Sequence, residues 1–262
     1  MGKIRIKGKP TSRTIDGEQQ EVILLDNKKL EKFNPHVLAL GDISLPSKQV
    51  EALAAVFDLS GFTNFCSKVD PHLAVPEYLS RFLDWLFDTI RTELTARSYA
   101  KTKALWAELP FLAKFLGDGG LFLWDTQNMS ETLICNIVVT LYDICGEYKS
   151  TFYPKIKRVV VDPPQLLRCG IARGRVFSVG NGQDYVGPCI NIASRLQKLG
   201  HLTFCFPRRG FDIEEYMHPK SAELFVEKCV TIGGIGENEL VWVLKEEFDK
   251  LPEKEKELFR EP

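Results

Sequence analysis

The alternation of apolar and polar residues predicts one strand and two long helices. The apolar run Ala52–Phe57 indicates a buried strand that ends at Asp58. Apolar residues recur at helical spacing within residues 71–97, which predicts a long amphipathic helix packed on a sheet. A second helix with the same spacing is predicted to begin after Ser130, whose hydroxyl suits an N-cap. Both apolar stripes are expected to belong to the core.

A hairpin is predicted between these two helices. Two apolar runs within Phe111–Trp124 flank a Gly-Asp-Gly-Gly turn that contains Asp118. A glycine-rich turn between apolar runs is a strong hairpin signal, because glycine adopts the backbone conformations that tight turns require. Asp118 is therefore expected at the edge of a sheet.

The second half of the chain shows shorter signals. Glycines punctuate two predicted strands between Leu167 and Tyr185, with a hairpin between them. Phe204–Phe206 and Glu239–Leu244 are predicted to be further strands. Residues 147–166 contain three prolines and are interpreted as a connecting loop, and residues 246–262 as a frayed, charged helix. This alternation of strands and helices is typical of an α/β or α+β domain.

The composition limits the classes of function. With 262 residues, 44% of them hydrophobic and 26% charged, the chain can build one sizeable core with extra segments. A net charge of −1 gives no support for nucleic-acid binding. No apolar run approaches the roughly 18–20 residues of a membrane span, so no membrane span is expected. The expected location is cytoplasmic. The seven cysteines are dispersed and odd in number, and are expected to be reduced packing residues.

Asp58 and Asp118 are the strongest candidates for chemistry. Each is expected at the end of a strand, and Gly61 follows the first of them in a turn whose backbone amides can face phosphate oxygens. Hard divalent cations choose carboxylate and phosphate oxygens, so two such aspartates beside a phosphate-binding turn suit a two-metal phosphoryl-transfer centre. The alternative is that both are ordinary turn residues that end strands.

Asn191 and Arg195 form a second candidate pair. They are four residues apart in a predicted helix and therefore share one face, while Ile192 and Leu196 face the core. A guanidinium presents a rigid fork of donors that fits phosphate oxygens, although Arg195 could instead be a surface cation that pairs locally. The chain has no P-loop motif, no zinc-ligand spacing and no nucleophile elbow.

Four blocks of this sequence together resemble the class III nucleotidyl cyclases, the adenylate and guanylate cyclase catalytic domain family. The blocks are Val56–Thr63, Lys114–Asp118, Cys169–Gly180 and Gly187–Arg195. They follow the family's order and spacing, and the resemblance spans roughly residues 50 to 245. It implies an α+β fold with a ferredoxin-like βαββαβ core sheet and helices on one face.

The resemblance also implies a domain layout and an assembly. The expected layout is an N-terminal lead-in over residues 1–48, a catalytic domain over 49–246 and a charged tail over 247–262. In the family, one chain supplies the metal aspartates and its partner supplies the residues for the base, the ribose and the transition state. Because this chain has both sets, a symmetric homodimer with two equivalent composite sites is expected.

The resemblance assigns a role to each candidate residue. The carboxylates of Asp58 and Asp118, with the carbonyl of Leu59, would hold two Mn²⁺ or Mg²⁺ ions per site. Asn191 would orient the ribose, and Arg195 would stabilise the charge that builds on the α-phosphoryl group. The backbone that would cradle the triphosphate comprises Ser60, Gly61, Phe62 and Thr63. The reaction implied is attack of the ribose 3′-oxygen on the α-phosphorus, with pyrophosphate as the leaving group.

The identity of the base is less strongly specified. Lys114 and Asp184 stand where adenylate cyclases place their adenine-recognising lysine and aspartate. An ammonium donor and a carboxylate acceptor also suit the edges of uracil and cytosine, so this pair alone does not discriminate. Trp106–Phe111 replaces the family's Gly-Gly before the lysine strand, and its bulk predicts a smaller base pocket.

These departures most resemble the pyrimidine cyclases of bacterial Pycsar anti-phage systems. That resemblance implies conversion of UTP, or alternatively CTP, to the 3′,5′-cyclic monophosphate, which activates a separate effector protein. A bacterial adenylate cyclase is one alternative, and an inactive cyclase-homology module that binds nucleotide or dimerises is another. Gly233–Gly236 lacks the lysines that hold the triphosphate in the family, so Arg173 or Arg175 is expected to supply that charge.

Overall fold

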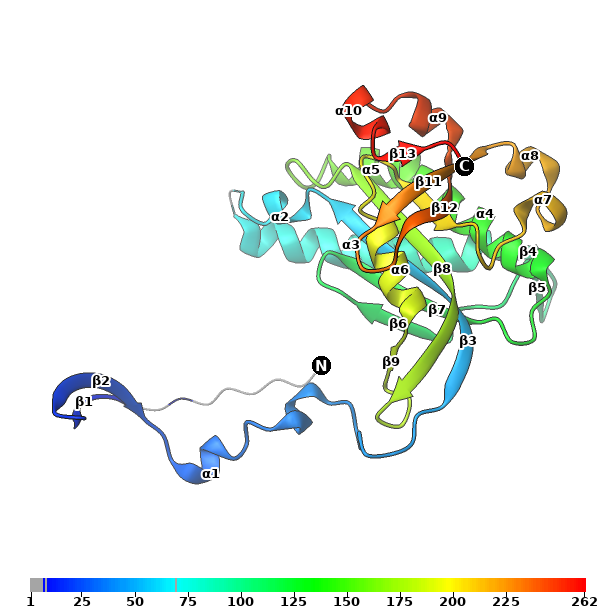
Figure 1. The fold of residues 1–262 in the computed structure, drawn as a ribbon. Helices are drawn as coiled ribbons and strands as arrows, with labels where there is room; N and C mark the ends of the chain where they lie inside the picture. Colours follow the sequence, from blue (N-terminus) through cyan, green and yellow to red (C-terminus); the bar gives the residue numbers. More distant parts are fainter. Residues whose placement is uncertain (1–6, 8, 69) are drawn as a thin grey trace. The chain divides into compact units, whose positions relative to one another are not determined.

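A computed structural model describes residues 7, 9–68 and 70–262 and divides the chain into two compact units (Figure 1). The smaller unit contains residues 1–48 and 177–186, and the larger contains residues 49–176 and 187–262. The start of the lead-in segment, residues 1–6 and 8, lies outside the described residues. Within the part of the chain that is described, no helix is both long and apolar enough to cross a bilayer.

The larger unit is built on a mostly antiparallel sheet in the order β13-β11-β12-β10-β8-β3-β7-β6. Its strands are β3 (Gln49–Ser60), β6 (Leu112–Phe115), β7 (Gly119–Asp125), β8 (Leu166–Val179), β10 (Phe204–Pro207), β11 (Phe225–Ile232), β12 (Gly236–Leu244) and β13 (Phe259–Arg260). Strands β3, β6, β7 and β8, with the helices between them, give the expected βαββαβ core, with neighbours in the order β8-β3-β7-β6. The predicted strand at Ala52–Phe57 and the predicted hairpin are both confirmed.

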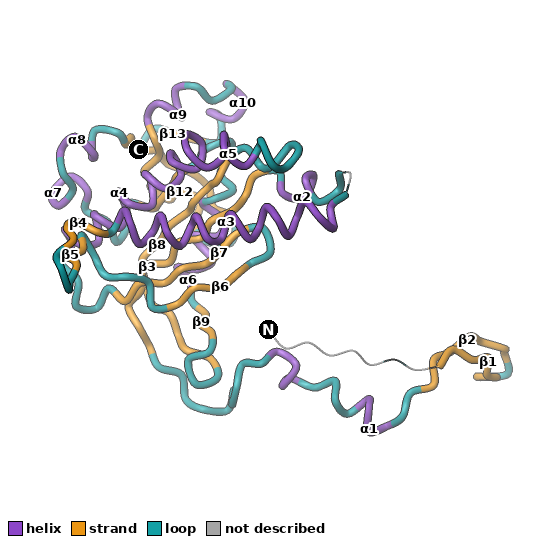
Figure 2. Tube along the Cα trace, turned by 180° about the vertical axis from the view of Figure 1, so that it is seen from behind, coloured by secondary structure: helices purple, strands orange, loops and turns teal. Residues whose placement is uncertain are grey.

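Helices cover both faces of this sheet. Figure 2 shows α3 (Pro71–Glu93) and α4 (Glu131–Glu147) on one face, whereas α6 (Pro188–Leu196) lies on the other in Figure 1. The expectation of helices on one face alone is therefore wrong for α6. Alternation along β3 explains both layers, because successive side chains of a strand point to opposite faces and residues 52–59 are all buried. Gly170 on β8 permits the close approach of α6, since a Cβ there would stand 2.2 Å from the carbonyl oxygen of Ala193.

The two long helices follow their predicted patterns. Ser130 caps α4 as predicted, with its Oγ accepting a hydrogen bond from the Leu133 amide at 3.3 Å. Helix α3 ends at Glu93, earlier than predicted, because residues 95–98 instead form a strand. The larger unit also contains several short elements: α2 (Phe62–Phe65), the paired strands β4 (Thr95–Ser98) and β5 (Lys103–Leu105), α7 (Ile213–Tyr216) and α8 (Pro219–Ala222).

The segment interpreted as a connecting loop after α4 is largely helical. The helix continues as a π-helical turn (Tyr148–Phe152) and then as α5 (Tyr153–Ile156), so the loop interpretation is wrong there. Pro154 directly follows the π-helical turn, where the regular i→i−4 hydrogen-bond ladder is already interrupted, so its missing N–H is tolerated there. Tyr148 and Phe152 are buried against the aromatic side chains of α3, which favours helix over loop.

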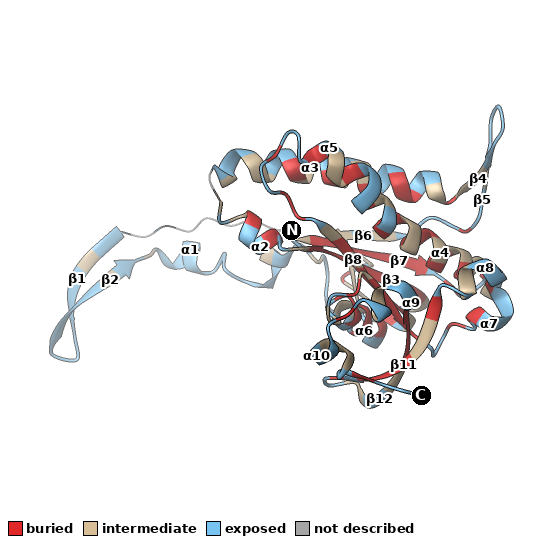
Figure 3. Cartoon of the chain, turned by 90° about the horizontal axis from the view of Figure 1, so that it is seen from above, coloured by how far each residue is buried: buried red, intermediate tan, exposed pale blue. Residues whose placement is uncertain are grey.

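The C-terminal segment is also more ordered than predicted. It forms α9 (Lys245–Asp249), α10 (Glu253–Lys256) and strand β13, which pairs with β11 at the edge of the sheet. Leu251 and Phe259 are buried, and they supply the apolar contacts that a frayed, charged helix would lack. Figure 3 shows the buried residues gathered in the strands and on the inner sides of the helices.

The smaller unit has little core of its own. It contains the hairpin β1 (Lys9–Ile15) and β2 (Glu18–Leu24), α1 (Asn27–Leu30), a 3₁₀ turn (Pro35–Leu38), the end of β8 and strand β9 (Asp184–Val186). Lys48 and Ser178 exchange hydrogen bonds, with the Lys48 amide donating to Ser178 Oγ at 2.8 Å and the Ser178 amide donating to the Lys48 carbonyl at 2.9 Å. Gly180 has a left-handed φ of 55° and packs directly on the Leu40 carbonyl, where no side chain would fit.

Candidate active site

The backbone brings Asp58 and Asp118 to neighbouring strand ends. In the antiparallel ladder of β3 and β7, Asp58 stands opposite Gly119. The next residue, Leu59, donates its amide to the carbonyl oxygen of Asp118 at 2.8 Å. The two acidic residues therefore occupy adjacent rungs at one edge of the sheet, as the predicted hairpin requires. Asp58 is buried and Asp118 is partly exposed.

Glycines make this close strand pairing possible. A Cβ on Gly119 would stand 1.9 Å from the carbonyl oxygen of Phe57, a distance that no side chain can occupy. Gly117 has a φ of 102°, in the region that favours glycine, and the turn closes through the Leu116 amide, which donates to the Gly119 carbonyl at 3.0 Å. The Gly-Asp-Gly-Gly sequence thus fixes where Asp118 lies relative to β3.

The carboxylate of Asp58 is bound by Arg168, a residue that the sequence reasoning missed. Arg168 donates to Asp58 Oδ2 from Nη2 at 2.6 Å and from Nε at 3.2 Å. Only 9% of the Asp58 side chain and 19% of the Arg168 side chain are exposed. A signal was available, because Arg168 is the only charged residue in the apolar start of β8, and a charge inside a buried strand needs a partner.

The turn after β3 has the form expected of a phosphate-binding loop. Gly61 adopts a φ of 84° and begins α2, so the first amides of that helix lack intrahelical acceptors. Phe62 is buried against Phe65 and Tyr78, which anchors the turn to the core. Gly61 and Thr63 remain exposed, and Ser60 is partly exposed. Backbone amides, rather than side chains, are thus available at this turn.

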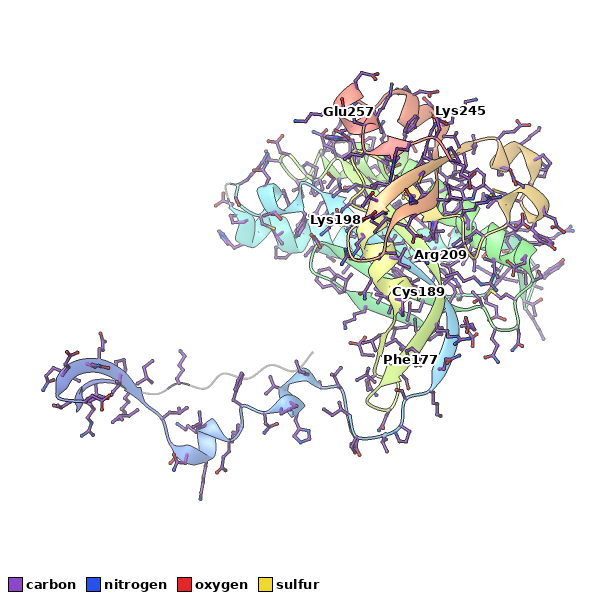
Figure 4. All side chains as sticks on the ribbon, in the orientation of Figure 1. Phe177, Cys189, Lys198, Arg209, Lys245 and Glu257 are labelled. Atoms are coloured by element: carbon purple, nitrogen blue, oxygen red, sulfur yellow. The ribbon has the colours of Figure 1, made fainter. Side chains whose placement is uncertain are left out.

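Helix α6 presents Asn191 and Arg195 on its exposed face. Its buried face packs Ile192, Ala193 and Leu196 on the sheet, as the spacing predicted. Figure 4 labels Cys189 near the start of this helix and Lys198 just beyond its end. The Arg195 guanidinium lies beside the turn between β11 and β12, where a Cβ on Gly234 would be 3.3 Å from Nη2. Among the described residues it makes no hydrogen bond or ion pair, so its donors are available to an anion.

The two arginines expected to replace the missing triphosphate lysines are bound to carboxylates. Arg173 donates from Nη1 to both oxygens of Glu131, at 2.7 and 2.9 Å, and from Nε to Thr126 Oγ1 at 3.3 Å. Arg175 donates from Nε to Glu51 at 3.0 Å. Arg168, rather than either of these, is the cation that contacts an aspartate of the candidate metal pair.

Lys114 and Asp184, the candidate base-reading residues, belong to different compact units. Lys114 lies on β6, opposite Leu121 of β7, and is partly exposed. Asp184 begins β9 in the smaller unit, where its Oδ1 accepts a hydrogen bond from the Tyr185 amide at 2.9 Å. Each residue thus lies on a strand within its own unit.

The cysteines play no part in the candidate chemistry. All seven are free, and all but Cys66 are buried. Cys189 lies in the fourth sequence block, Gly187–Arg195, but burial raises the pKa of its thiol to about 11, so the thiol stays protonated at neutral pH. Such a thiol is a poor nucleophile, and the expectation of reduced packing residues is confirmed.

The donor set at the sheet edge fits a hard divalent cation bound together with a nucleotide. Within the described residues, no cluster of three or more histidine, cysteine, aspartate or glutamate side chains could hold a metal. One chain offers the carboxylates of Asp58 and Asp118 and the carbonyl oxygen of Leu59. Phosphate oxygens of the nucleotide and water would complete the coordination. This partial set is typical of Mg²⁺, which is commonly held by one or two carboxylates plus substrate phosphates.

Comparison with solved structures identifies the fold. The adenylyl cyclase CyaB from P. aeruginosa superposes with a TM-score of 0.56 at 13% identity, covering 76% of this chain and 96% of that one. A bacterial light-regulated adenylyl cyclase superposes with a TM-score of 0.52 at 16% identity, covering 84% of this chain and 61% of that one. The catalytic core of a rhodopsin–guanylyl cyclase with converted specificity, in complex with ATPαS, superposes with a TM-score of 0.51 at 19% identity. It covers 76% of this chain and 97% of that one. No protein-family model and no curated protein matches the sequence. The chain thus contains the α+β fold of class III cyclase catalytic domains.

Proposed function

We propose that this protein is a class III nucleotidyl cyclase that forms a 3′,5′-cyclic nucleoside monophosphate and pyrophosphate from a nucleoside triphosphate. The observation that supports this most strongly is the pairing of β3 with β7, which holds Asp58 and Asp118 on adjacent rungs beside the Gly61 turn. On the same fold, α6 exposes Asn191 and Arg195 for contact with a ligand. Two carboxylates, an amide-rich turn and an unpaired guanidinium are the groups that phosphoryl transfer requires.

The residues of this chain divide the work of the reaction. Backbone amides after Gly61 bind the phosphates, and Asn191 orients the ribose so that its 3′-oxygen is aligned with the α-phosphorus. Arg195 donates to the oxygens on which charge builds as pyrophosphate leaves. Asp58, Asp118 and the Leu59 carbonyl would hold Mn²⁺ or Mg²⁺, two per site, which when bound makes the 3′-hydroxyl more acidic and neutralises phosphate charge.

The active form proposed here is a symmetric homodimer with two composite sites. Arg195 makes no contact with Asp58 or Asp118 within the described part of the chain, whereas Arg168 of the same chain contacts Asp58 directly. A two-fold assembly uses each set of residues twice, because its interface is isologous. A single chain is therefore expected to be nearly inactive.

We favour a pyrimidine substrate, UTP before CTP. The segment before β6 supports this choice, because it is bulky and fixed: Trp124 Nε1 donates to the Glu108 carbonyl at 2.9 Å and Asn136 Nδ2 donates to the Trp106 carbonyl at 3.0 Å. A rigid, bulky wall next to the Lys114 strand narrows the space for a base. The product would act as a second messenger for a separate effector protein in bacterial anti-phage defence, the role that the sequence resemblance implies.

An adenylate cyclase is the second candidate function. The Lys114 and Asp184 positions match the adenine-reading residues of that group, and two of the solved structures with this fold are adenylyl cyclases. The decisive experiment incubates purified protein with each of the four nucleoside triphosphates and Mn²⁺ and identifies the products by mass. Cyclic UMP or cyclic CMP supports the pyrimidine proposal, and cyclic AMP alone supports the second candidate. Absence of every cyclic product would favour an inactive module and overturn the enzyme proposal.

A further inference from the structure

A polar cavity of about 400 Å³ opens beside the Gly61 turn, and nothing in the proposed chemistry yet uses it. It will be called the Lys68 cavity. Its lining residues come from the turn, from α2 and from the segment that leads into β8. They are Ser60, Gly61, Asn64, Phe65, Lys68, Asp162, Pro163, Pro164, Gln165 and Leu166. Two of them, Ser60 and Gly61, belong to the turn proposed to bind the triphosphate.

The wall of the Lys68 cavity is built before any ligand arrives. Pro163 and Pro164 are buried, and proline fixes the backbone of this wall. The carbonyl of Pro164 accepts a hydrogen bond from the Tyr148 hydroxyl at 2.6 Å. That hydroxyl is 2.7 Å from the hydroxyl of Tyr78 on α3, inside the aromatic core. The cavity is therefore attached to the rigid part of the domain, which limits the conformational cost of binding there.

The chemistry of the lining suits a doubly charged oxyanion group. Ser60, Asn64 and Gln165 offer neutral hydrogen-bond donors, and Lys68 offers a cation. Lys68 Nζ is 2.8 Å from Oδ2 of Asp162, whose side chain is 70% exposed. A solvent-exposed ion pair of this kind contributes little stability, so a more highly charged phosphate group can displace Asp162.

We infer that the Lys68 cavity binds the terminal diphosphate group of the substrate, which becomes the pyrophosphate product. Lys68 then supplies the positive charge that Gly233–Gly236 lacks and that Arg173 and Arg175, already bound to glutamates, do not provide. Asp162 is a competing anion that occupies Lys68 until the phosphates arrive. This inference rests on the proposed cyclase function for the identity of its ligand.

Two substitutions with opposite expected effects test this inference. Binding of inorganic pyrophosphate is measured by calorimetry at fixed Mg²⁺ for the wild type and for Lys68→Met, Lys68→Arg and Asp162→Asn. Lys68→Met is expected to weaken binding by about tenfold or more, because a charge-assisted hydrogen bond is lost. Asp162→Asn is expected to tighten binding, and Lys68→Arg to preserve it. Lys250→Met, which breaks an exposed ion pair with Glu246 far along the chain, is the matched control and is expected to have no effect.

The outcomes separate a binding role from a structural one. If the ion pair merely supports the fold, Lys68→Met and Asp162→Asn change pyrophosphate binding in the same direction or not at all, and the inference is wrong. Failure of the cyclase proposal is recognised separately, because it leaves no cyclic product from any triphosphate. Pyrophosphate binding that depends on Lys68 in the absence of any cyclic product would support the cavity and refute the cyclase. Formation of a cyclic product, together with pyrophosphate binding that does not depend on Lys68, would support the cyclase and refute the cavity inference.

Discussion

The Asp58–Arg168 pair allows a quantitative prediction about the metal site. In the structure the two charges are 2.6 Å apart, with 9% and 19% of their side chains exposed. Removing one partner of such a pair leaves a buried, uncompensated charge, which typically costs about 3–5 kcal/mol. Because Arg168 keeps some exposure, we expect Arg168→Met to lower the free energy of unfolding by about 3 kcal/mol, at the lower end of that range.

The assay is urea-induced unfolding at pH 7 and fixed protein concentration. Arg81→Met is the matched control, because Arg81 is also 2.6 Å from its partner, Glu77, while their side chains are 55% and 45% exposed. An exposed pair of this kind contributes about 0.3–0.5 kcal/mol, so the control is expected to change stability little. The double variant Asp58→Asn/Arg168→Met is expected to be more stable than the sum of the single losses implies, since neither charge is then left alone.

Mn²⁺ extends this test to the proposed metal ligand. A cation that binds the native state stabilises it, and in Arg168→Met the Asp58 carboxylate has no competing guanidinium. Added Mn²⁺ should therefore raise the stability of Arg168→Met more than that of the wild type, and should have little effect on the double variant. If Arg168→Met lowers the free energy of unfolding as little as Arg81→Met does, and Mn²⁺ has no effect on it, both the stabilising role of the buried pair and the metal assignment are refuted.

Two further substitutions test other parts of the fold. Gly119→Ala should cost several kcal/mol of stability or prevent folding, because the new Cβ would stand 1.9 Å from a backbone oxygen of β3. Gly146→Ala in α4 is the control and should be neutral or stabilising, because no atom lies within 4 Å of the new Cβ. Thermal unfolding of both variants checks this. Burial, with the nearby charges of Glu93 and Glu147, raises the pKa of Asp143 to about 6. Its charged form therefore destabilises the native state progressively as the pH rises from the ordinary value of 3.8 through 6. Asp143→Asn should stabilise the protein at pH 8 by on the order of 1 kcal/mol, allowing for solvent screening, and have no effect at pH 3.5; a pH-independent difference would contradict this reasoning.

The sequence was sufficient where periodicity or turn chemistry is local. The strand ending at Asp58, the hairpin around Asp118 and helix α4 with its Ser130 cap each follow from residues close together in the chain. The extent of the helix after α4 could not be predicted, because Pro154 suggests a loop and only burial against α3 favours a helix. Strand β13 was missed for a similar reason: the acidic and basic residues around it conceal Phe259, whose burial comes from a distant strand.

The candidate site was predicted less completely than the fold. Asn191 and Arg195 share an exposed face because their spacing is a property of the helix itself. The contact of Arg168 with Asp58 joins residues 110 positions apart, so it depends on the order of strands in the sheet. The availability of Arg173 and Arg175 was misjudged likewise, because the glutamates that bind them lie on other elements.

The composite active site is tested most directly by mixing two inactive variants. Asp118→Asn removes a proposed metal ligand and Arg195→Ala removes the proposed transition-state arginine, so each purified variant alone should form almost no cyclic nucleotide from the preferred triphosphate with Mn²⁺. After subunit exchange at equal amounts, about half of the dimers are mixed and each has one intact site, which predicts about a quarter of the wild-type rate. A mixture that stays as inactive as its two components would contradict a cyclase site shared between two copies of this chain.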